Sequence, residues 1–261
     1  MINKPIVGVA ALIFVLAAGG VYYLKTRNPT LPAAPTAPAS EPPAQEPGIV
    51  HPLPPAGNAP SAALPDLADS DTPLREALAQ LSNAEAVKNF LSPQDLVRKI
   101  VVTVDNLPRQ KVAVDKRPAN PTAGSFVVNG DELHATLDQR NFERYKPMVA
   151  VISQLDAKQL GALYIHYYPL FQQSYQNLGY PNGYFNDRLV EVIDNLLQAP
   201  DPKGPIDLVR PNVMYIYADP AMESRSAGQK LLIRMGPENA KAVKAKLTEL
   251  RAVITAGPLK H

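Results

Sequence analysis

The pattern of apolar positions is clearest between residues 156 and 198, where it follows helical spacing in two consecutive runs. The first run consists of Leu160, Leu163, Tyr164, Tyr167, Phe171, Tyr175 and Leu178, and the second of Leu189, Val192, Ile193 and Leu196. A corner, Gly179–Tyr184, separates them, and its two glycines and one proline are typical of a turn. We therefore expect a helical hairpin packed face to face. Pro169 lies inside the first run and predicts a kink or a break there.

Shorter patterns fill the rest of the chain after residue 65. Helical spacing unites Leu74, Leu78 and Leu81, then Leu96, Ile100 and Val104, and near the end Ala240, Val243, Leu247, Leu250 and Ile254. Further helices are expected over 148–155 and 219–235. Alternation at 111–114, a hairpin over 126–137 with Asn129-Gly130 as its turn, and a run at 213–217 predict short strands. The fold class is therefore mainly α, with a small β-hairpin or sheet.

A continuous apolar stretch opens the chain. Ile6–Leu24 contains 19 residues without a charge, with Lys4 before it and Lys25 and Arg27 after it. About 20 apolar residues span the core of a bilayer, so this stretch predicts a single transmembrane helix. The alternative is a signal peptide cleaved after residue 17 or 18, although the apolar core is long and continues into Tyr-Tyr-Leu-Lys.

The segment 28–65 reads as a linker. Twelve of its 38 residues are proline and nine are alanine, and only Glu41 and Glu46 are charged. Proline lacks an N–H and fixes φ, so we expect a disordered, polyproline-like spacer. Its PxxP spacings could dock a proline-binding module, but such spacings arise from the composition alone. The chain thus divides into an anchor (1–27), a Pro/Ala-rich linker (28–65) and a globular domain (66–261).

The charges that flank the apolar stretch do not decide its orientation, because the α-amine and Lys4 roughly match Lys25 and Arg27. A short N-terminal tail before a large C-terminal domain is the usual layout of a signal anchor. We expect a single-pass inner-membrane protein with a periplasmic C-terminal domain.

Composition excludes several functions. Lys and Arg total 26 against 24 Asp and Glu, a near balance that argues against a nucleic-acid partner. The chain has no cysteine, hence no disulfide, thiolate metal site or cysteine nucleophile. The four histidines, His51, His134, His166 and His261, do not form HxxxH or HExxH spacing. No GxSxG, SxxK or phosphate-binding loop is present, so we assign no metal, no cofactor and no catalytic residue.

One acidic pattern offers an enzymatic alternative. Asp187, Glu191 and Asp194 follow each other at i, i+4 and i+7, which places three carboxylates on one face of the second helix of the hairpin. Paired carboxylates cleave glycosidic bonds, so Asp187 and Glu191 could serve a cell-wall hydrolase. The simpler interpretation is a solvated acidic face, with Arg188 near enough to form an ion pair.

The corner is the candidate binding site. It brings together tyrosines and hydrogen-bonding groups within nine residues: Tyr180, Asn182, Tyr184, Asn186, Asp187 and Arg188. Tyrosine and arginine are enriched at interface hot spots, which favours a recognition surface. In the structural interpretation the rings instead support the turn. A second cluster is basic, contains Arg109, Lys111, Lys116 and Arg117, and reads as a solvated loop that could also meet an anionic polymer or lipid headgroup.

Three segments carry a resemblance to a known family: DNLPRQKVAV, YYPLFQQSYQNLGYPNGYFNDRLVEVIDNLL and SAGQKLLIRMGPENAKAVKAKL. They are similar to a family of bacterial envelope proteins, the three thousand and fourteenth of the numbered domains of unknown function. The resemblance covers about residues 66–256 and extends to the anchor and proline-rich linker. It implies a Gram-negative source, inner-membrane anchoring and a largely helical domain, and it brings no established activity, cofactor or catalytic residue.

These observations predict a membrane-anchored envelope protein with a binding or scaffold domain. We expect its partner to be another envelope protein or the peptidoglycan. The alternative is a cell-wall hydrolase that uses Asp187 and Glu191, and a third possibility is self-association through an exposed apolar helix face.

Overall fold

A computed structural model describes residues 48–54, 63–81, 90–110, 118–120, 122–131, 134–212 and 214–256. The predicted anchor, most of the linker, the alternating run at 111–114 and the basic residues Lys111, Lys116 and Arg117 lie outside these ranges. Within them, no helix is long and apolar enough to cross a membrane.

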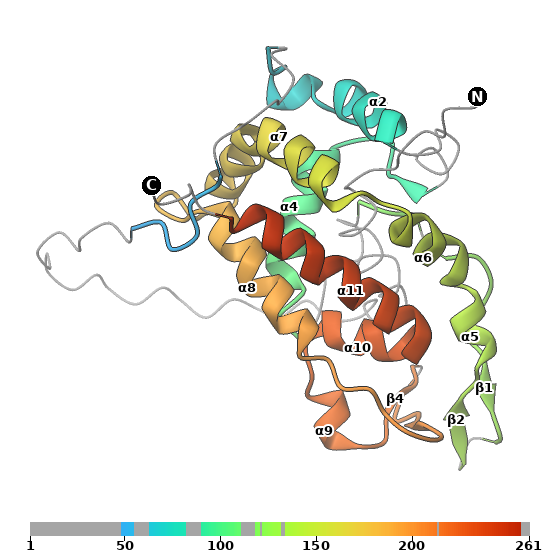
Figure 1. Ribbon diagram of the computed structural model, residues 1–261. Helices are drawn as coiled ribbons and strands as arrows, with labels where there is room; N and C mark the ends of the chain where they lie inside the picture. The colour runs from blue at the N-terminus through green and yellow to red at the C-terminus, as the bar shows by residue number, and fades with distance from the viewer. Residues whose placement is uncertain are drawn as a thin grey trace, which may run out of the picture.

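The described part of the chain is mainly helical and carries a small antiparallel sheet, as predicted (Figure 1). The helices are a 3₁₀ turn η1 (Leu67–Asp69), α2 (Asp71–Leu81), α4 (Leu96–Asn106), α5 (Arg140–Glu143), α6 (Lys146–Ser153), α7 (Ala157–Asn177), α8 (Phe185–Leu197), α9 (Pro220–Glu223), α10 (Ala227–Arg234) and α11 (Pro237–Ile254). The strands are β1 (Val128–Asn129), β2 (Ala135–Leu137), β3 (Asp207–Val209) and β4 (Ile216–Tyr217).

The predicted helical hairpin is formed by α7 and α8. Asp156 begins α7 by accepting the N–H groups of Lys158 and Gln159, each at 2.9 Å. The helix continues through Pro169 without a break. The two helices of the hairpin touch, but each of them packs more extensively on α4 and α11 than on the other. The predicted face-to-face packing of α7 on α8 therefore describes only part of the arrangement, because α7 and α8 also bury the apolar faces of α4 and α11.

The main core lies among these four helices, with α2, α6 and α10 around it (Figure 1). Its centre is fully enclosed: Leu160, Phe185, Val243 and Ile254 are 0% exposed. Phe185, the first residue of α8, stacks on Phe171 of α7 with ring centroids 5.7 Å apart. Burial of these large side chains provides the main driving force for folding.

The sheet lies at the far end of the molecule from α2 and has the order β1-β2-β3-β4, antiparallel throughout (Figure 1). The predicted hairpin is confirmed, with Val128 opposite Leu137, but the two-residue turn predicted at Asn129-Gly130 is wrong, because Asn129 belongs to β1 and lies opposite Thr136. The strand predicted at 213–217 is present as the two residues of β4, while β3 was not predicted. A second, small core of six buried residues supports the sheet: Ala135, Leu137, Ile206, Leu208, Tyr217 and Ile233.

The single helix expected over 219–235 is wrong, because the segment forms two helices, α9 and α10. Ser226 separates them: its hydroxyl accepts the N–H of Gln229 at 3.2 Å and donates to Asn195 Oδ1 of α8 at 2.8 Å. A serine at this position begins a new helix and attaches it to the main core. Gly236 then separates α10 from α11, as the sequence indicated.

Candidate functional site

The corner between α7 and α8 is held by polar side chains of α7. Gln172 Oε1 accepts the N–H of Phe185 and the hydroxyl of Tyr168, each at 2.8 Å, and its Nε2 donates to the carbonyl of Gly183 at 2.7 Å. Burial raises the pKa of Tyr168 to about 12, so this hydroxyl stays a donor at neutral pH. The turn is therefore held by side chains of α7.

Tyr180 and Arg188 reach from the corner to a buried carboxylate on α4. Asp105, 3% exposed, accepts Arg188 Nε at 3.2 Å and Arg109 Nη2 at 2.6 Å. Arg188 Nη2 also donates to the Asp105 carbonyl at 2.7 Å, and Tyr180 donates its hydroxyl to the carboxylate at 3.4 Å. Two arginines and a tyrosine thus satisfy one buried charge, which is the condition for keeping it inside a fold.

Asn186 is the most buried member of the predicted surface, at 1% exposed. Its Oδ1 accepts the Tyr164 hydroxyl at 3.1 Å, and its Nδ2 donates to the carbonyls of His51 at 2.8 Å and Ile254 at 3.3 Å. Burial raises the pKa of Tyr164 well above its ordinary value. One amide thereby joins α7, the last residue of α11 and the segment before the domain.

The three carboxylates of the acidic face have three different partners. Asp187 accepts the N–H groups of Val50 at 3.1 Å and His51 at 2.6 Å. Glu191 pairs with Arg188 at 2.7 Å, and Asp194 forms a two-point ion pair with Arg251 of α11, at 2.6 and 2.9 Å. The hydrolase alternative on Asp187 and Glu191 stays a prediction.

Asn182 and Tyr184 differ from the other predicted corner residues. Asn182 is exposed and Tyr184 is half-buried, and neither side chain forms a hydrogen bond to the described part of the chain. The structure therefore brings all six predicted residues to one corner but uses four of them internally. Recognition by this corner also stays a prediction.

The described histidines are dispersed. His51 belongs to the segment that meets α8, His134 is exposed beside Asp131, and His166 contacts the Tyr167 ring edge-on. No group of three or more His, Asp or Glu within the described ranges is arranged to hold a metal ion.

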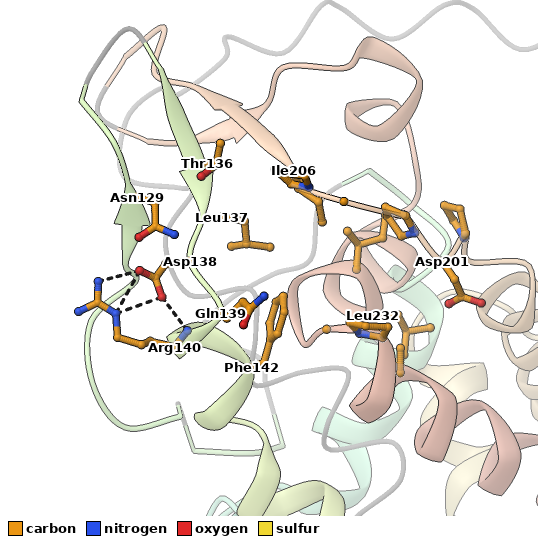
Figure 2. A pocket seen from close by; sticks show the side chains of 18 residues that line it. Asn129, Thr136, Leu137, Asp138, Gln139, Arg140, Phe142, Asp201, Ile206 and Leu232 are labelled. Atoms are coloured by element: carbon orange, nitrogen blue, oxygen red, sulfur yellow. Dashed lines mark hydrogen bonds and ion pairs between the residues drawn. The ribbon is translucent and has the colours of Figure 1, made fainter.

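A pocket that sequence reasoning missed lies between the sheet and the helices α10 and α11 (Figure 2). Its volume is about 720 Å³. Three segments of the chain line it: residues 129–142 of the hairpin and α5, residues 200–206 of the loop before β3, and residues 232–240 around Gly236. Such pockets, partly apolar with a few polar groups at the rim, are the usual form of a ligand site.

Phe142 forms one wall of the pocket beside Gln139 and Leu232 (Figure 2). It packs against Gly236, where φ is +86° and an added Cβ would lie 2.5 Å from the Phe142 ring. Only glycine fits this close approach. Leu137, Ile206 and Leu232 supply buried apolar surface to the same pocket.

Each charged side chain that lines the pocket already has a partner. The carboxylate of Asp138 accepts Arg140 Nε at 3.0 Å and Nη2 at 2.7 Å, and also the Arg140 N–H at 2.7 Å. These hydrogen bonds lower the pKa of Asp138. Asp201 pairs with Lys244 at 2.9 Å. The pocket therefore presents no uncompensated charge to a ligand.

The sequence contained only indirect signals for this pocket. Pro200, Pro202 and Pro205 fall within six residues and stiffen the loop that forms one side, and the Gly236-Pro237 break marks another. No spacing rule connects these positions with Phe142, because the fold alone brings them together.

Comparison with known proteins identifies a family and no activity. No curated protein and no solved structure matches the chain. A sequence-family model described as "Protein of unknown function (DUF3014)" matches residues 96–251, which is more than half of the chain and includes α4, α7, α8, α10 and the pocket. The chain therefore belongs to the DUF3014 family.

Proposed function

We propose that the protein is a single-pass, inner-membrane-anchored protein of the bacterial envelope whose periplasmic domain binds a ligand in the pocket between the sheet and α10–α11. The uncharged stretch Ile6–Leu24 and the proline-rich spacer support the anchoring. The pocket is the observation that carries the binding function, because both apolar and polar side chains line it.

The charge distribution of the pocket selects the ligand class. Asp138 and Asp201 are neutralised by Arg140 and Lys244, so a charged ligand gains no free counter-ion. Three polar side chains on the lining make no hydrogen bond to the described part of the chain and are available to a ligand: Asn129, Thr136 and Gln139. The pocket therefore suits an uncharged ligand with an apolar face and hydrogen-bonding edges.

N-acetylated sugars have this combination, because their ring face and acetyl methyl are apolar while their hydroxyls and amide form hydrogen bonds. The glycan strands of peptidoglycan supply such sugars in the compartment proposed for the domain. We therefore assign the pocket to cell-wall glycan. Another envelope protein is the alternative partner, and failure of the wild type to bind the glycan would favour it.

The test is a calorimetric titration of the full chain in detergent micelles with a short oligomer of N-acetylglucosamine. Pro205→Trp places an indole at the pocket rim and should weaken binding at least about tenfold, which is 1.4 kcal/mol. Pro211→Trp is the matched control, because Pro211 is exposed and does not line the pocket. Binding by both variants at wild-type strength, or no binding by the wild type, would overturn the proposal.

Mass analysis of the oligomer after the titration separates binding from hydrolysis. An oligomer of unchanged length supports a binding module. Shortened products that disappear on Asp187→Asn and Glu191→Gln substitution would establish the hydrolase alternative instead.

A further inference from the structure

Residues 48–54, part of the predicted linker (28–65), lie against the start of α8 (Figure 1, blue). The N–H groups of two successive residues, Val50 and His51, donate to the two carboxylate oxygens of Asp187 at 3.1 and 2.6 Å. The carbonyl of His51 accepts Asn186 Nδ2 at 2.8 Å. Two neighbouring side chains of α8 thus contact two donors and one acceptor of a backbone that bends at Val50 and His51.

The contact depends on the backbone of the segment more than on its side chains. Ile49 and Val50 are 48% and 71% exposed, so their side chains contribute little to the attachment. Leu53 is the exception, since it packs against the main core. Pro52 and Pro54 restrict the backbone of the free segment, so less conformational entropy is lost on docking.

We propose that Asp187 and Asn186 form a docking clamp for a bent stretch of polypeptide backbone, and that residues 49–53 of this chain are its occupant. The clamp is defined by these two side chains. It attaches the spacer to Asn186, which also forms hydrogen bonds with Tyr164 and with the carbonyl of Ile254. A pull on the spacer therefore reaches the four-helix core directly and does not pass through α2.

The clamp also sets the length of the spacer, a consequence that rests on the proposed anchoring. His51 and Asp66, where the globular domain was predicted to begin, are 15 positions apart. When the clamp is closed this stretch carries no load, and when it opens the stretch lengthens the tether by up to about 50 Å. Docking costs the conformational entropy of several residues and gains the free energy of a few hydrogen bonds. Because these two terms are of comparable size, loss of one hydrogen bond strongly lowers the fraction of docked chains.

The test uses the full chain, which has no cysteine and accepts a pair of spin labels without background. One label replaces the exposed side chain of Val50 and the other replaces Lys241, which is exposed on α11. Pulsed EPR in micelles should give a single narrow distance distribution for the closed clamp.

Two variants open the clamp from opposite sides. His51→Pro removes the shorter N–H contact without changing α8, and Asp187→Asn removes the charged acceptor without changing the segment. Each should lower the ratio of docked to undocked chains at least about tenfold and broaden the distribution. Ile49→Pro is the control, because the Ile49 N–H takes no part in the clamp.

Near-UV circular dichroism of the tyrosines checks that each variant retains the folded core. A broad distribution in the wild type, or a narrow one in both His51→Pro and Asp187→Asn, would overturn the proposal. The glycan titration is unaffected by either result, since the clamp lies outside the pocket lining.

Discussion

The helical core and the sheet lobe, which comprises β1–β4, differ in how completely they fill their own interior. The helical core contains long amphipathic elements whose buried side chains extend from Leu74 of α2 to Ile254 of α11. The sheet lobe has strands of two or three residues, and four of the six buried residues of the small core belong to them: Ala135, Leu137, Leu208 and Tyr217. Such short strands cannot cover their own face, so the seam against α10 and α11 stays hollow and forms the pocket.

The two regions also treat polar groups differently. In the helical core, Asp105 and Asn186 are buried and fully supplied with partners from distant segments. Beside the sheet, Asp138 is also buried and pairs with Arg140, but Asn129, Thr136 and Gln139 on the pocket lining form no hydrogen bond with the described part of the chain. Buried networks of the first kind hold one conformation, whereas the rim of the pocket keeps hydrogen-bonding groups free for a ligand.

The largest expected effect contrasts one truncation in each region. Phe185→Ala removes a ring that contacts Phe171, Tyr164 and Tyr175, and should lower the free energy of unfolding by about 3–5 kcal/mol. Leu208→Ala in the sheet should cost about 2–3 kcal/mol, because its surroundings are less complete. Urea denaturation measures both, and equal losses would remove the distinction between the regions.

The next effect concerns the seam itself. Gly236 has φ +86° and ψ 161° and lies against the Phe142 ring, so Gly236→Ala should cost about 2–4 kcal/mol through backbone strain and steric clash together. Gly204→Ala is the matched control on the opposite side of the pocket. Its φ is +88°, but no atom lies within 4 Å of an added Cβ, so about 1 kcal/mol of strain alone is expected. Similar losses in urea denaturation would show that Phe142 moves aside freely.

The smallest effect has the opposite sign. The Thr103 hydroxyl is buried in the helical core and has no hydrogen-bond partner in the described part of the chain. Thr103→Val should therefore stabilise the protein by up to about 1 kcal/mol. Thr136→Val at the pocket, where the hydroxyl is half-buried and reached by water, should change stability by less than about 0.5 kcal/mol. Thermal unfolding that ranks the two variants in reverse would contradict this view of the core.

The sequence predicted those elements whose pattern is long enough to read. The stripe from Leu160 to Tyr175 gave α7, and the stripe from Ala240 to Ile254 gave α11. β3 was not predicted because Asp207–Val209 is too short to show more than one alternation of polar and apolar residues. The start of α10 was not predicted because the cap at Ser226 depends on a hydrogen bond to Asn195 of another helix. Short elements are decided by their tertiary neighbours more than by local spacing.

The predicted corner shows the same limit for sites. The sequence selected Asn186, Asp187 and Arg188 as one cluster, and the structure places them together. Their partners are His51, Ile254 and Asp105, which lie 135, 68 and 83 positions from the residues they bond. Periodicity carries no information about such long-range pairs. The sequence therefore could not show which polar residues of the corner form hydrogen bonds within the fold and which remain free.

The hydrogen bonds of Asn186 also have a consequence for changes in the chain connectivity of the domain. The carbonyl oxygens of His51 and Ile254 both lie within 3.3 Å of one amide nitrogen, so residues 48–54 and the end of α11 meet at one point. Adjacent ends are the geometric requirement for circular permutation and for insertion into a host protein. A reporter domain fused after residue 256 therefore emerges beside residues 48–54, on the side of the core away from the sheet (Figure 1).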